Sequence, residues 1–405
     1  MKTLPNVELK GDSLGFWLVV GGLGLVVLGG LGAAWMMEHH GHVITGMNNQ
    51  IVWGLPHVFA VFLIVAASGA LNVASIGSVF GRTVYKPLAP LSALLAVALL
   101  IGGLAVLVLD LGRPERLIVA MTHYNFKSIF AWNIFLYVGF LAVVAVYLWM
   151  MMERRMNRLS TPVGVFAFVW RLVLTTGTGS IFGFLVAREA YDAAIMAPLF
   201  IAMSFSFGLA IFILVLMAHY GASNRPLGDA VMGRLRRLLG IFVAAVLYFV
   251  AVQHVTNLYA AEHGGVEAFI LRDGGVYTSL FWIGQVLLGG VVPLVLLFSS
   301  ATAGRSATML AAALVIVGGF AQIFIIIIGG QAYPLVLFPG MEVSSSFGDG
   351  IAASYTPSLP EVMLGLGGIA LAGLIVVLGP LVLRFLPISL SDERVDPHTK
   401  SASGA

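Results

Sequence analysis

The chain has 405 residues, of which 60% are hydrophobic and only 10% are charged, and its formal net charge is +3. A water-soluble domain cannot bury so much apolar surface, so we predict that the chain lies in a lipid bilayer. The sequence contains no cysteine, which excludes cysteine-ligated iron–sulfur clusters, thiolate zinc sites and disulfides within this chain. Any iron–sulfur cluster that works with it must therefore belong to a partner.

Ten apolar segments reach the roughly 20 residues that a helix needs to cross the hydrocarbon core. They lie near 14–37, 52–80, 88–111, 128–151, 162–187, 196–218, 238–259, 278–299, 309–330 and 362–384. We therefore expect an all-α polytopic membrane protein with ten transmembrane helices, arranged as two four-helix bundles with two peripheral helices. Prolines at the start of the second and sixth segments, Pro56 and Pro198, indicate a parallel internal repeat of the two bundles.

These segments divide the chain into consecutive parts. We expect a cytoplasmic N-terminal segment (1–12), an extra first helix with a His-rich outside loop (13–51), two bundles (52–192 and 193–333), an outside loop (334–361), a last helix (362–386) and a cytoplasmic tail (387–405). The first helix lacks a small-residue cleavage pattern, so we interpret it as a retained span. The long loop either covers a site, docks a partner or carries no chemistry. The polar tail from Ser389 is expected to be disordered.

Lysine and arginine are distributed unevenly between the two ends of the predicted helices. With a cytoplasmic N-terminus, fifteen of them face inward and five face outward. This bias follows the positive-inside rule and predicts a bacterial inner-membrane protein with both ends in the cytoplasm. Arg171 is the one charge expected inside a span. Because no Asp or Glu lies near the middle of a span, we do not expect a carboxylate relay across the membrane.

Polar residues gather at one membrane face around the second and third segments. His57 lies one turn inside an otherwise apolar helix, where an ionisable side chain is costly and therefore a candidate for function. A neutral imidazole can exchange a hydrogen bond and a proton with a quinone oxygen. Asp110 ends the third segment, where the helix dipole disfavours a carboxylate, so we expect Arg113 to compensate its charge. We assign catalytic proton transfer to His57 and Asp110. The alternatives are a histidine that bonds only a neighbouring helix, and an Asp–Arg clasp that shapes the turn.

The predicted quinone-binding set is Trp53, His57, Asp110, Arg113, Asn125, Trp132 and His254. Asn125 and Trp132 open the fourth span beside the cluster, although an interfacial belt accounts for them equally well. His254 lies in the outer half of the seventh span, where polar side chains also join helices to one another. His39, His40 and His42 are interpreted as a solvated loop, because no cysteine or set carboxylate accompanies them, and no metal site is predicted.

Two motifs carry a resemblance to a known family. Trp53–His57 reads Trp-Gly-Leu-Pro-His, and Leu109–Pro114 reads Leu-Asp-Leu-Gly-Arg-Pro. Both resemble the NrfD/PsrC family of polysulfide reductase membrane subunits, over roughly the second to ninth spans. The ten-span length, together with Met37–His42 and Gly46–Gln50, looks most like the DsrP subunits of DsrMKJOP sulfur-metabolism complexes.

The resemblance implies a subunit that contains no haem or iron–sulfur cluster. It would bind menaquinone or ubiquinone near the outer face and exchange electrons with a periplasmic iron–sulfur subunit docked there. Its site would include His57, Asp110 and Arg113. In a DsrP-like complex the further partners would be a haem c subunit, a haem b membrane subunit and a cytoplasmic iron–sulfur subunit.

Two other functions remain open at this point. Ten spans and a repeat also suit a secondary transporter, but we expect no span to be broken at mid-depth, and the polar cluster lies at one face. A haem b cytochrome could use His57 and His254 as axial ligands, and the visible spectrum of the purified protein would distinguish it. We favour the quinone subunit.

Overall fold

A computed structural model describes residues 6–153, 155–302, 304–335, 340 and 350–395. Within these residues, ten helices are long and apolar enough to cross a membrane, which confirms the predicted all-α polytopic fold. The spans are α1 (Leu14–His40), α2 (Leu55–Ala70) with α3 (Asn72–Ser78), α4 (Ala89–Leu109), α6 (Ile129–Met152), α7 (Ser160–Phe184), α8 (Met196–Ala222), α9 (Asp229–Tyr259), α11 (Val276–Ser279) with η7 (Leu280–Val291) and α12 (Val292–Phe298), α13 (Arg305–Phe324) with η9 (Ile325–Gly329) and α14 (Gly330–Ala332), and α15 (Leu359–Val382).

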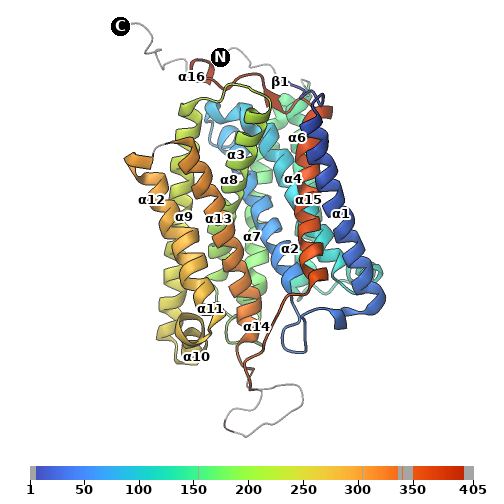
Figure 1. Cartoon of the computed structure of the whole chain (residues 1–405), viewed down its shortest axis with the longest axis vertical. Helices are drawn as coiled ribbons and strands as arrows, with labels where there is room; N and C mark the ends of the chain where they lie inside the picture. The colour runs from blue at the N-terminus through green and yellow to red at the C-terminus, as the bar shows by residue number, and fades with distance from the viewer. Residues whose placement is uncertain (1–5, 154, 303, 336–339, 341–349, 396–405) are drawn as a thin grey trace.

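Short elements connect the spans and pair the two ends of the chain. They are β1 (Asn6–Val7), η1 (His42–Ile44), η2 (Thr83–Leu88), η3 (Pro114–Arg116), α5 (Leu117–Thr122), η4 (Asn157–Leu159), η5 (Ala261–His263), α10 (Gly264–Ala268), η6 (Phe269–Asp273), η8 (Ser300–Thr302), β2 (Leu386–Pro387) and α16 (Asp392–Val395). β1 and β2 pair antiparallel at the end of the bundle that we call the terminal end, because both chain ends lie there (Figure 1). The opposite end, with η1, α10 and α14, is called the distal end.

Helix α2 lies at the centre of the bundle and packs against α4, α8, α13 and α15. Its contact with α8 is close, because a Cβ on Gly69 would meet the carbonyl of Ser204 and one on Gly208 would meet the backbone of Gly69 and Ala70. Small residues allow such approach in lipid, where dispersion between backbones replaces the hydrophobic effect. Helix α1 packs mainly on α15 and is largely exposed (Figure 1). The site therefore rests on the most deeply packed span of the chain.

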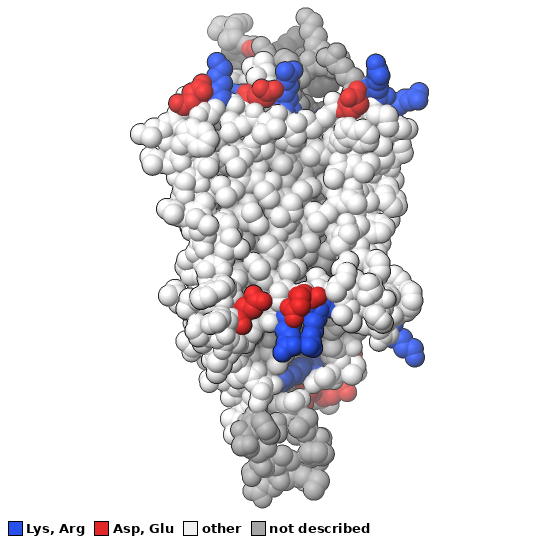
Figure 2. All heavy atoms as spheres, turned by 90° about the vertical axis from the view of Figure 1, so that its right-hand side faces the viewer, with Lys and Arg blue, Asp and Glu red and all other residues white. Residues whose placement is uncertain are grey.

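Charged side chains lie in two bands at the two ends of the molecule. Figure 2 shows a broad zone between these bands that is free of Lys, Arg, Asp and Glu on the face in view. This distribution matches a bilayer whose hydrocarbon core excludes charge and whose interfaces accept it.

The second span, Leu55–Ser78, is interrupted at Leu71 between α2 and α3, nearer its terminal end than its middle. The interruption frees backbone groups that other helices bond instead. The hydroxyl of Ser92 donates to the carbonyl of Ala70 at 2.6 Å and accepts from the N–H of Ala74 at 3.1 Å. Arg171, buried in α7, donates from Nη1 to the carbonyl of Ser68 at 3.1 Å. Breaks inside a membrane span are tolerated where neighbouring helices satisfy the freed groups in this way.

The expectation of a disordered tail is wrong for its described part, 389–395. Leu390 and Val395 are 0% and 1% exposed, and Leu390 exchanges backbone hydrogen bonds with the segment that precedes α9. Their apolar side chains cover the terminal end of the bundle, which a polarity average over the tail does not reveal. Residues 396–405 lie outside the described residues.

Candidate functional site

The site is built on the turn that ends α4. Asp110 is the C-cap residue of this helix, and Gly112 follows with a φ of +66°. Left-handed backbone favours glycine, because a Cβ there crowds the following carbonyl. A Cβ on Gly112 would also lie 3.0 Å from Cε1 of His42. The glycine of the Leu-Gly-Arg-Pro sequence therefore serves both to turn the chain and to admit the His42 ring.

Two imidazoles flank the carboxylate of Asp110. Nδ1 of His57 lies 2.8 Å from Oδ2, and Nε2 of His42 lies 3.6 Å from Oδ1 and 3.1 Å from the backbone carbonyl of Asp110. The Asp110 side chain is 1% exposed, whereas those of His57 and His42 are 19% and 29% exposed. Both carboxylate oxygens are within ion-pair distance of a ring, and the 2.8 Å contact with His57 is short, but the ring orientations depart from good hydrogen-bond geometry. The carboxylate is therefore buried with unused capacity to accept hydrogen bonds.

The protonation of the site follows from these contacts. Burial raises the pKa of Asp110, but polar and electrostatic contacts with His42 and His57 outweigh burial and hold that pKa below its ordinary value. Contact with Asp110 raises the pKa of His42 in turn, against the opposing effect of partial burial. The lowered pKa favours the anion of Asp110, and the raised pKa favours the protonated form of the His42 ring beside it. His57 faces the same anion through Nδ1, which leaves Nε2 as its remaining ring nitrogen.

An aromatic cluster adjoins His57 through Trp53. The Trp53 indole is stacked at 6.0 Å from the His57 ring and contacts Phe130 and Phe182 edge-on at 5.9 and 6.1 Å. Phe182 is buried, whereas Phe130 at the start of α6 is 43% exposed. An exposed aromatic wall beside a half-buried imidazole can receive a flat apolar ring that carries polar oxygens.

Glu361 fixes the chain immediately before His57, although its residue number is far away. It is 0% exposed at the start of α15 and accepts from the N–H groups of Gly46 and Ser358 at 2.8 and 2.7 Å. The Tyr355 hydroxyl donates to Glu361 at 2.7 Å and accepts from the N–H of Leu55 at 2.6 Å. The described part of the long loop (350–361) therefore packs on the entry to α2, as one of the sequence-based alternatives proposed.

Gln331 holds the same segment from the opposite side. Its Oε1 accepts from the N–H groups of Val52 and Trp53 at 2.9 and 3.1 Å, and its Nε2 donates to the carbonyl of Trp53 at 3.0 Å. Arg188 adds a bond from Nη2 to the carbonyl of Gln50 at 2.7 Å. Loops from both halves of the chain thus fix the position of Trp53 and His57.

Four residues of the predicted binding set are not in contact with this cluster among the described residues. The guanidinium of Arg113 is exposed and forms no recorded ion pair with Asp110, so the expected Asp110–Arg113 compensation is wrong, and His42 takes its place. Asn125 is exposed and caps its own turn by accepting from the N–H of Lys127. Trp132 donates to the carbonyl of Phe126. Asn125 and Trp132 are thus satisfied by neighbours close in sequence, and Arg113 extends into the exposed region.

The fourth residue, His254, belongs to a second buried cluster at the distal end. Its Nδ1 lies 2.6 Å from Oε2 of Glu267, and Asn257 donates to Oε1 at 2.9 Å. The Glu267 side chain is 1% exposed. The two histidines considered as haem ligands thus lie on α2 and α9, and each faces its own carboxylate.

Sequence reasoning missed His42, Glu361 and Tyr355 as parts of the site. It grouped His42 with His39 and His40, both of which are exposed. The chain turns at Gly41, immediately before His42, and the His42 ring therefore faces Asp110. Glu361 does carry a signal: Ser358-Leu-Pro-Glu361 is the Ser-x-x-Glu pattern of a capping box, and the Glu361 side chain accepts from the N–H of Ser358 at 2.7 Å. No local pattern indicates the long-range bonds of Tyr355.

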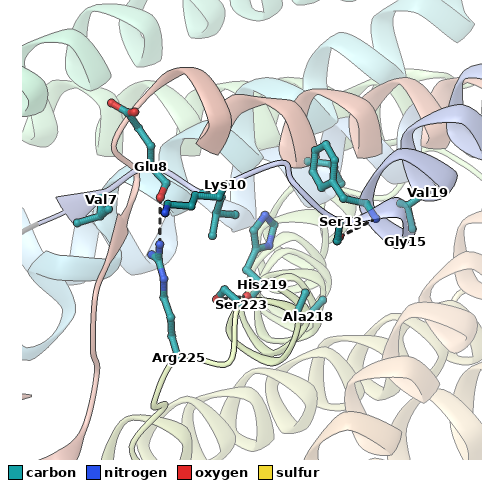
Figure 3. A pocket seen from close by; sticks show the side chains of 14 residues that line it. Val7, Glu8, Lys10, Ser13, Gly15, Val19, Ala218, His219, Ser223 and Arg225 are labelled. Carbon is teal, nitrogen blue, oxygen red and sulfur yellow. Dashed lines mark hydrogen bonds between the residues drawn. The ribbon is translucent and has the colours of Figure 1, made fainter.

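The cavity in Figure 3, with a volume of about 710 Å³, lies at the terminal end and shares no residue with the His42–Asp110–His57 cluster. Its histidine, His219, contacts the carbonyls of Val215 and Val376 with its two ring nitrogens at 2.8 and 3.2 Å. Its arginine, Arg225, bonds the carbonyls of Glu8 and Leu386. These groups fasten the N-terminal segment and are already satisfied, so we place the candidate chemistry at the distal end despite the larger cavity at this one.

The fold and the cluster define a multi-pass membrane protein of ten apolar helices with an ionisable site at one membrane face. Comparison with family models then identifies the family: residues 43–334 match "Polysulphide reductase, NrfD", and the chain belongs to this family.

Curated relatives match over almost the whole chain. A protein of Archaeoglobus fulgidus, named "Hdr-like menaquinol oxidoreductase integral membrane subunit", is 28% identical over 96% of this chain and 98% of its own length. A Halobacterium salinarum protein, named as a candidate membrane subunit of a dimethyl sulfoxide reductase, is 30% identical over 92% and 91%. A Wolinella succinogenes protein, named as a chain of polysulfide reductase, is 25% identical over 70% of the present chain and 96% of its own. The first two relatives extend over parts of this sequence that the third does not cover.

Proposed function

We propose that this chain is the quinone-exchanging membrane subunit of a multi-subunit oxidoreductase, and that His57 and Asp110 handle the protons. The observation that carries the proposal is the buried Asp110 carboxylate with Nδ1 of His57 at 2.8 Å. The negative charge of Asp110 stabilises the N–H of a neutral His57 on the nearby Nδ1, which leaves Nε2 as a base. The names of the curated relatives, which refer to a menaquinol oxidoreductase and to reductase membrane subunits, support the same class of function.

The chemistry balances as the loss of two electrons and two protons from a quinol. Nε2 of His57 takes a proton from one quinol hydroxyl, and the Asp110 anion stabilises the imidazolium that forms. The second proton leaves along the half-exposed His42 side of the cluster. Both electrons pass to a redox centre of a partner subunit, and the reverse sequence reduces a quinone. Trp53 offers an aromatic face beside His57 for the flat headgroup.

The partner docks over the distal end, which we propose faces outward, with both chain ends in the cytoplasm. The excess of Lys and Arg at the terminal end supports this orientation. Exposed Arg113 and Arg116 lie just after the site and suit contact with a periplasmic iron–sulfur subunit. Menaquinol is the first quinol to test, in view of the name of the Archaeoglobus fulgidus relative, and ubiquinol is the second. A place in sulfur metabolism, with haem c, haem b and cytoplasmic iron–sulfur partners as in DsrP-like complexes, rests on the segments 37–42 and 46–50 alone.

The test uses the complex purified from its native membrane with its partner subunits. His57→Gln should lower quinol-dependent electron transfer by about 100-fold or more, because a positioned base contributes about that factor. His40→Gln removes an exposed imidazole at the same end of the bundle and should leave turnover unchanged. Full turnover in a correctly assembled His57→Gln complex would contradict the assignment.

The interruption at Leu71 is the observation that favours the alternative of a secondary transporter, since broken spans form binding sites in such proteins. Near the interruption, the carbonyl of Ala70 accepts from Ser92 and the carbonyl of Ser68 accepts from Arg171. Carbonyls that are already bonded fit a structural kink better than an open ion site. Uptake of labelled anions by proteoliposomes that contain the chain alone would decide for the transporter.

A further inference from the structure

A basic pocket lies at the terminal end, between the α3–η2 turn and the start of α9. Its volume is about 810 Å³, and it is lined by Ile76, Phe80, Arg82, Tyr85, Arg234, Arg237 and Leu238. Three of these seven residues are arginines, and among the described lining residues none is acidic. We propose that this pocket binds the phosphate group of an anionic phospholipid.

The arginines come together from separate parts of the chain. Arg82 follows α3, whereas Arg234 and Arg237 lie three residues apart on one face of α9. Arg82 and Arg237 bring like charges into one pocket, and like charges repel each other. The guanidinium groups of Arg82 and Arg237 are exposed and have no recorded hydrogen bond or ion pair among the described residues. A bound anion would remove this repulsion, and the phosphate oxygens would accept several guanidinium donors.

The neighbouring arginine shows what a structural role looks like on the same helix. Arg236 faces α12 and donates from Nη2 to the carbonyls of Leu296 and Ser299, both at 3.0 Å. The cavity of Figure 3 gives a second contrast, because its arginine bonds the backbone carbonyl of Glu8 and an acidic residue, Glu8, is part of its lining. The guanidinium groups of Arg82 and Arg237 form no such bond in the described part of the chain, and the described lining of their pocket contains no acidic residue.

The walls of the pocket select a lipid over a soluble phosphate. Ile76, Phe80 and Leu238 form its apolar side, and Phe80 is 59% exposed. Ile76 lies on α3, Phe80 lies just after it and Leu238 lies on α9. Because α3 and α9 belong to membrane spans, the apolar side of the pocket continues toward the hydrocarbon zone. Basic pockets between transmembrane helices at a membrane interface recognise phospholipid headgroups by this combination of charge and apolar wall.

The test is lipid binding by the purified full chain after delipidation, followed by native mass spectrometry and thermal unfolding. Cardiolipin or phosphatidylglycerol should bind and raise the unfolding temperature, whereas phosphatidylcholine should not. The double variant Arg82→Gln/Arg237→Gln should weaken this binding about 25-fold, because each basic residue near an anionic headgroup contributes a factor of about five.

The matched control is Arg155→Gln/Arg158→Gln, which removes the same charge from exposed positions at the terminal end outside the pocket. It should retain full binding of the anionic lipid. Equal losses in the two double variants would overturn the proposal in favour of general surface attraction. Displacement of the lipid by millimolar inorganic phosphate would overturn the choice of a lipid and assign the pocket to a soluble phosphate.

Discussion

The distal end contains two buried carboxylate–imidazole clusters that differ in how well they are satisfied. In both, the acidic side chain is 1% exposed and Nδ1 of a histidine lies within 2.8 Å of it. Glu267 receives Nδ1 of His254 and the amide of Asn257, one on each oxygen. Asp110 lies between two rings whose orientations depart from good hydrogen-bond geometry.

This difference separates a structural cluster from a reactive one. A buried polar group with all its bonds made stabilises the fold and has nothing left to offer a ligand. A buried carboxylate that lacks hydrogen-bond partners is costly. A protein retains such a group where a ligand or a proton supplies the missing partner. His57 also stacks on Trp53, whereas the ring next to His254 is the buried Phe281.

The largest expected effect comes from exchanging the two acids for their amides. Asp110→Asn should lower quinol-dependent turnover by about 100-fold or more, because it removes the anion that stabilises protonated His57. Glu267→Gln should change turnover by less than about threefold. Turnover of the assembled complex measures both variants, and an equal loss in the two would show that the clusters do not differ in function.

The same pair should rank in the opposite order for stability. Glu267→Gln weakens two buried hydrogen bonds and should lower the free energy of unfolding by about 1–3 kcal/mol. Asp110→Asn removes ion-pair contacts with His42 and His57, which are 29% and 19% exposed and therefore partly screened, and it should cost less. Thermal unfolding in detergent at neutral pH provides the comparison, and a larger loss for Asp110→Asn would contradict this ranking.

Glycine substitutions sharpen the role of the α4 turn. Gly112→Ala and Gly81→Ala both place a Cβ on left-handed backbone, with φ of +66° and +65°, at a cost of about 1–2 kcal/mol each. Only the Cβ at position 112 meets the His42 ring, since nothing lies within 4 Å of the one at position 81. We expect Gly112→Ala to reduce turnover and Gly81→Ala to leave it unchanged. Similar turnover in both variants would mean that the approach of His42 does not matter.

The pH dependence of stability reports the His42–Asp110 pair. The pKa of His42 is raised by folding, so its contribution is fully present below its unfolded pKa and disappears as pH rises through its folded pKa. The pKa of Asp110 is lowered, so its contribution is present above its unfolded pKa and disappears as pH falls through its folded pKa. The difference in unfolding temperature between wild type and His42→Gln should therefore be largest between about pH 4 and 6.5 and should decline at alkaline pH. A difference that grows above neutral pH would reverse the assignment.

The smallest effect is expected at Arg113, which the sequence placed in the quinone site. Its guanidinium is exposed and unpaired with Asp110 among the described residues. Arg113→Gln should leave the affinity for a quinone analogue within about twofold, as measured by binding to the purified chain. A tenfold loss would restore Arg113 to the site.

The sequence by itself determined the ten spans, the one-sided polar cluster and the importance of His57 and Asp110 as residues to examine. These features follow from local physics: apolar length fixes what can cross a bilayer, and a lone imidazole or carboxylate at a span end is costly wherever the helix is placed. The glycine and proline around Arg113 likewise indicated a turn.

Tertiary structure alone decided which groups meet. His42, rather than Arg113, approaches Asp110, because the turn at Gly112 leaves room for a ring that comes from a different loop. Glu361, Tyr355 and Gln331 reach the start of α2 across about 280 to 315 residues of sequence, and such bonds have no local periodicity to reveal them. The break at Leu71 depends on Ser92 and Arg171 of other helices, which supply the hydrogen bonds that the backbone of that span loses.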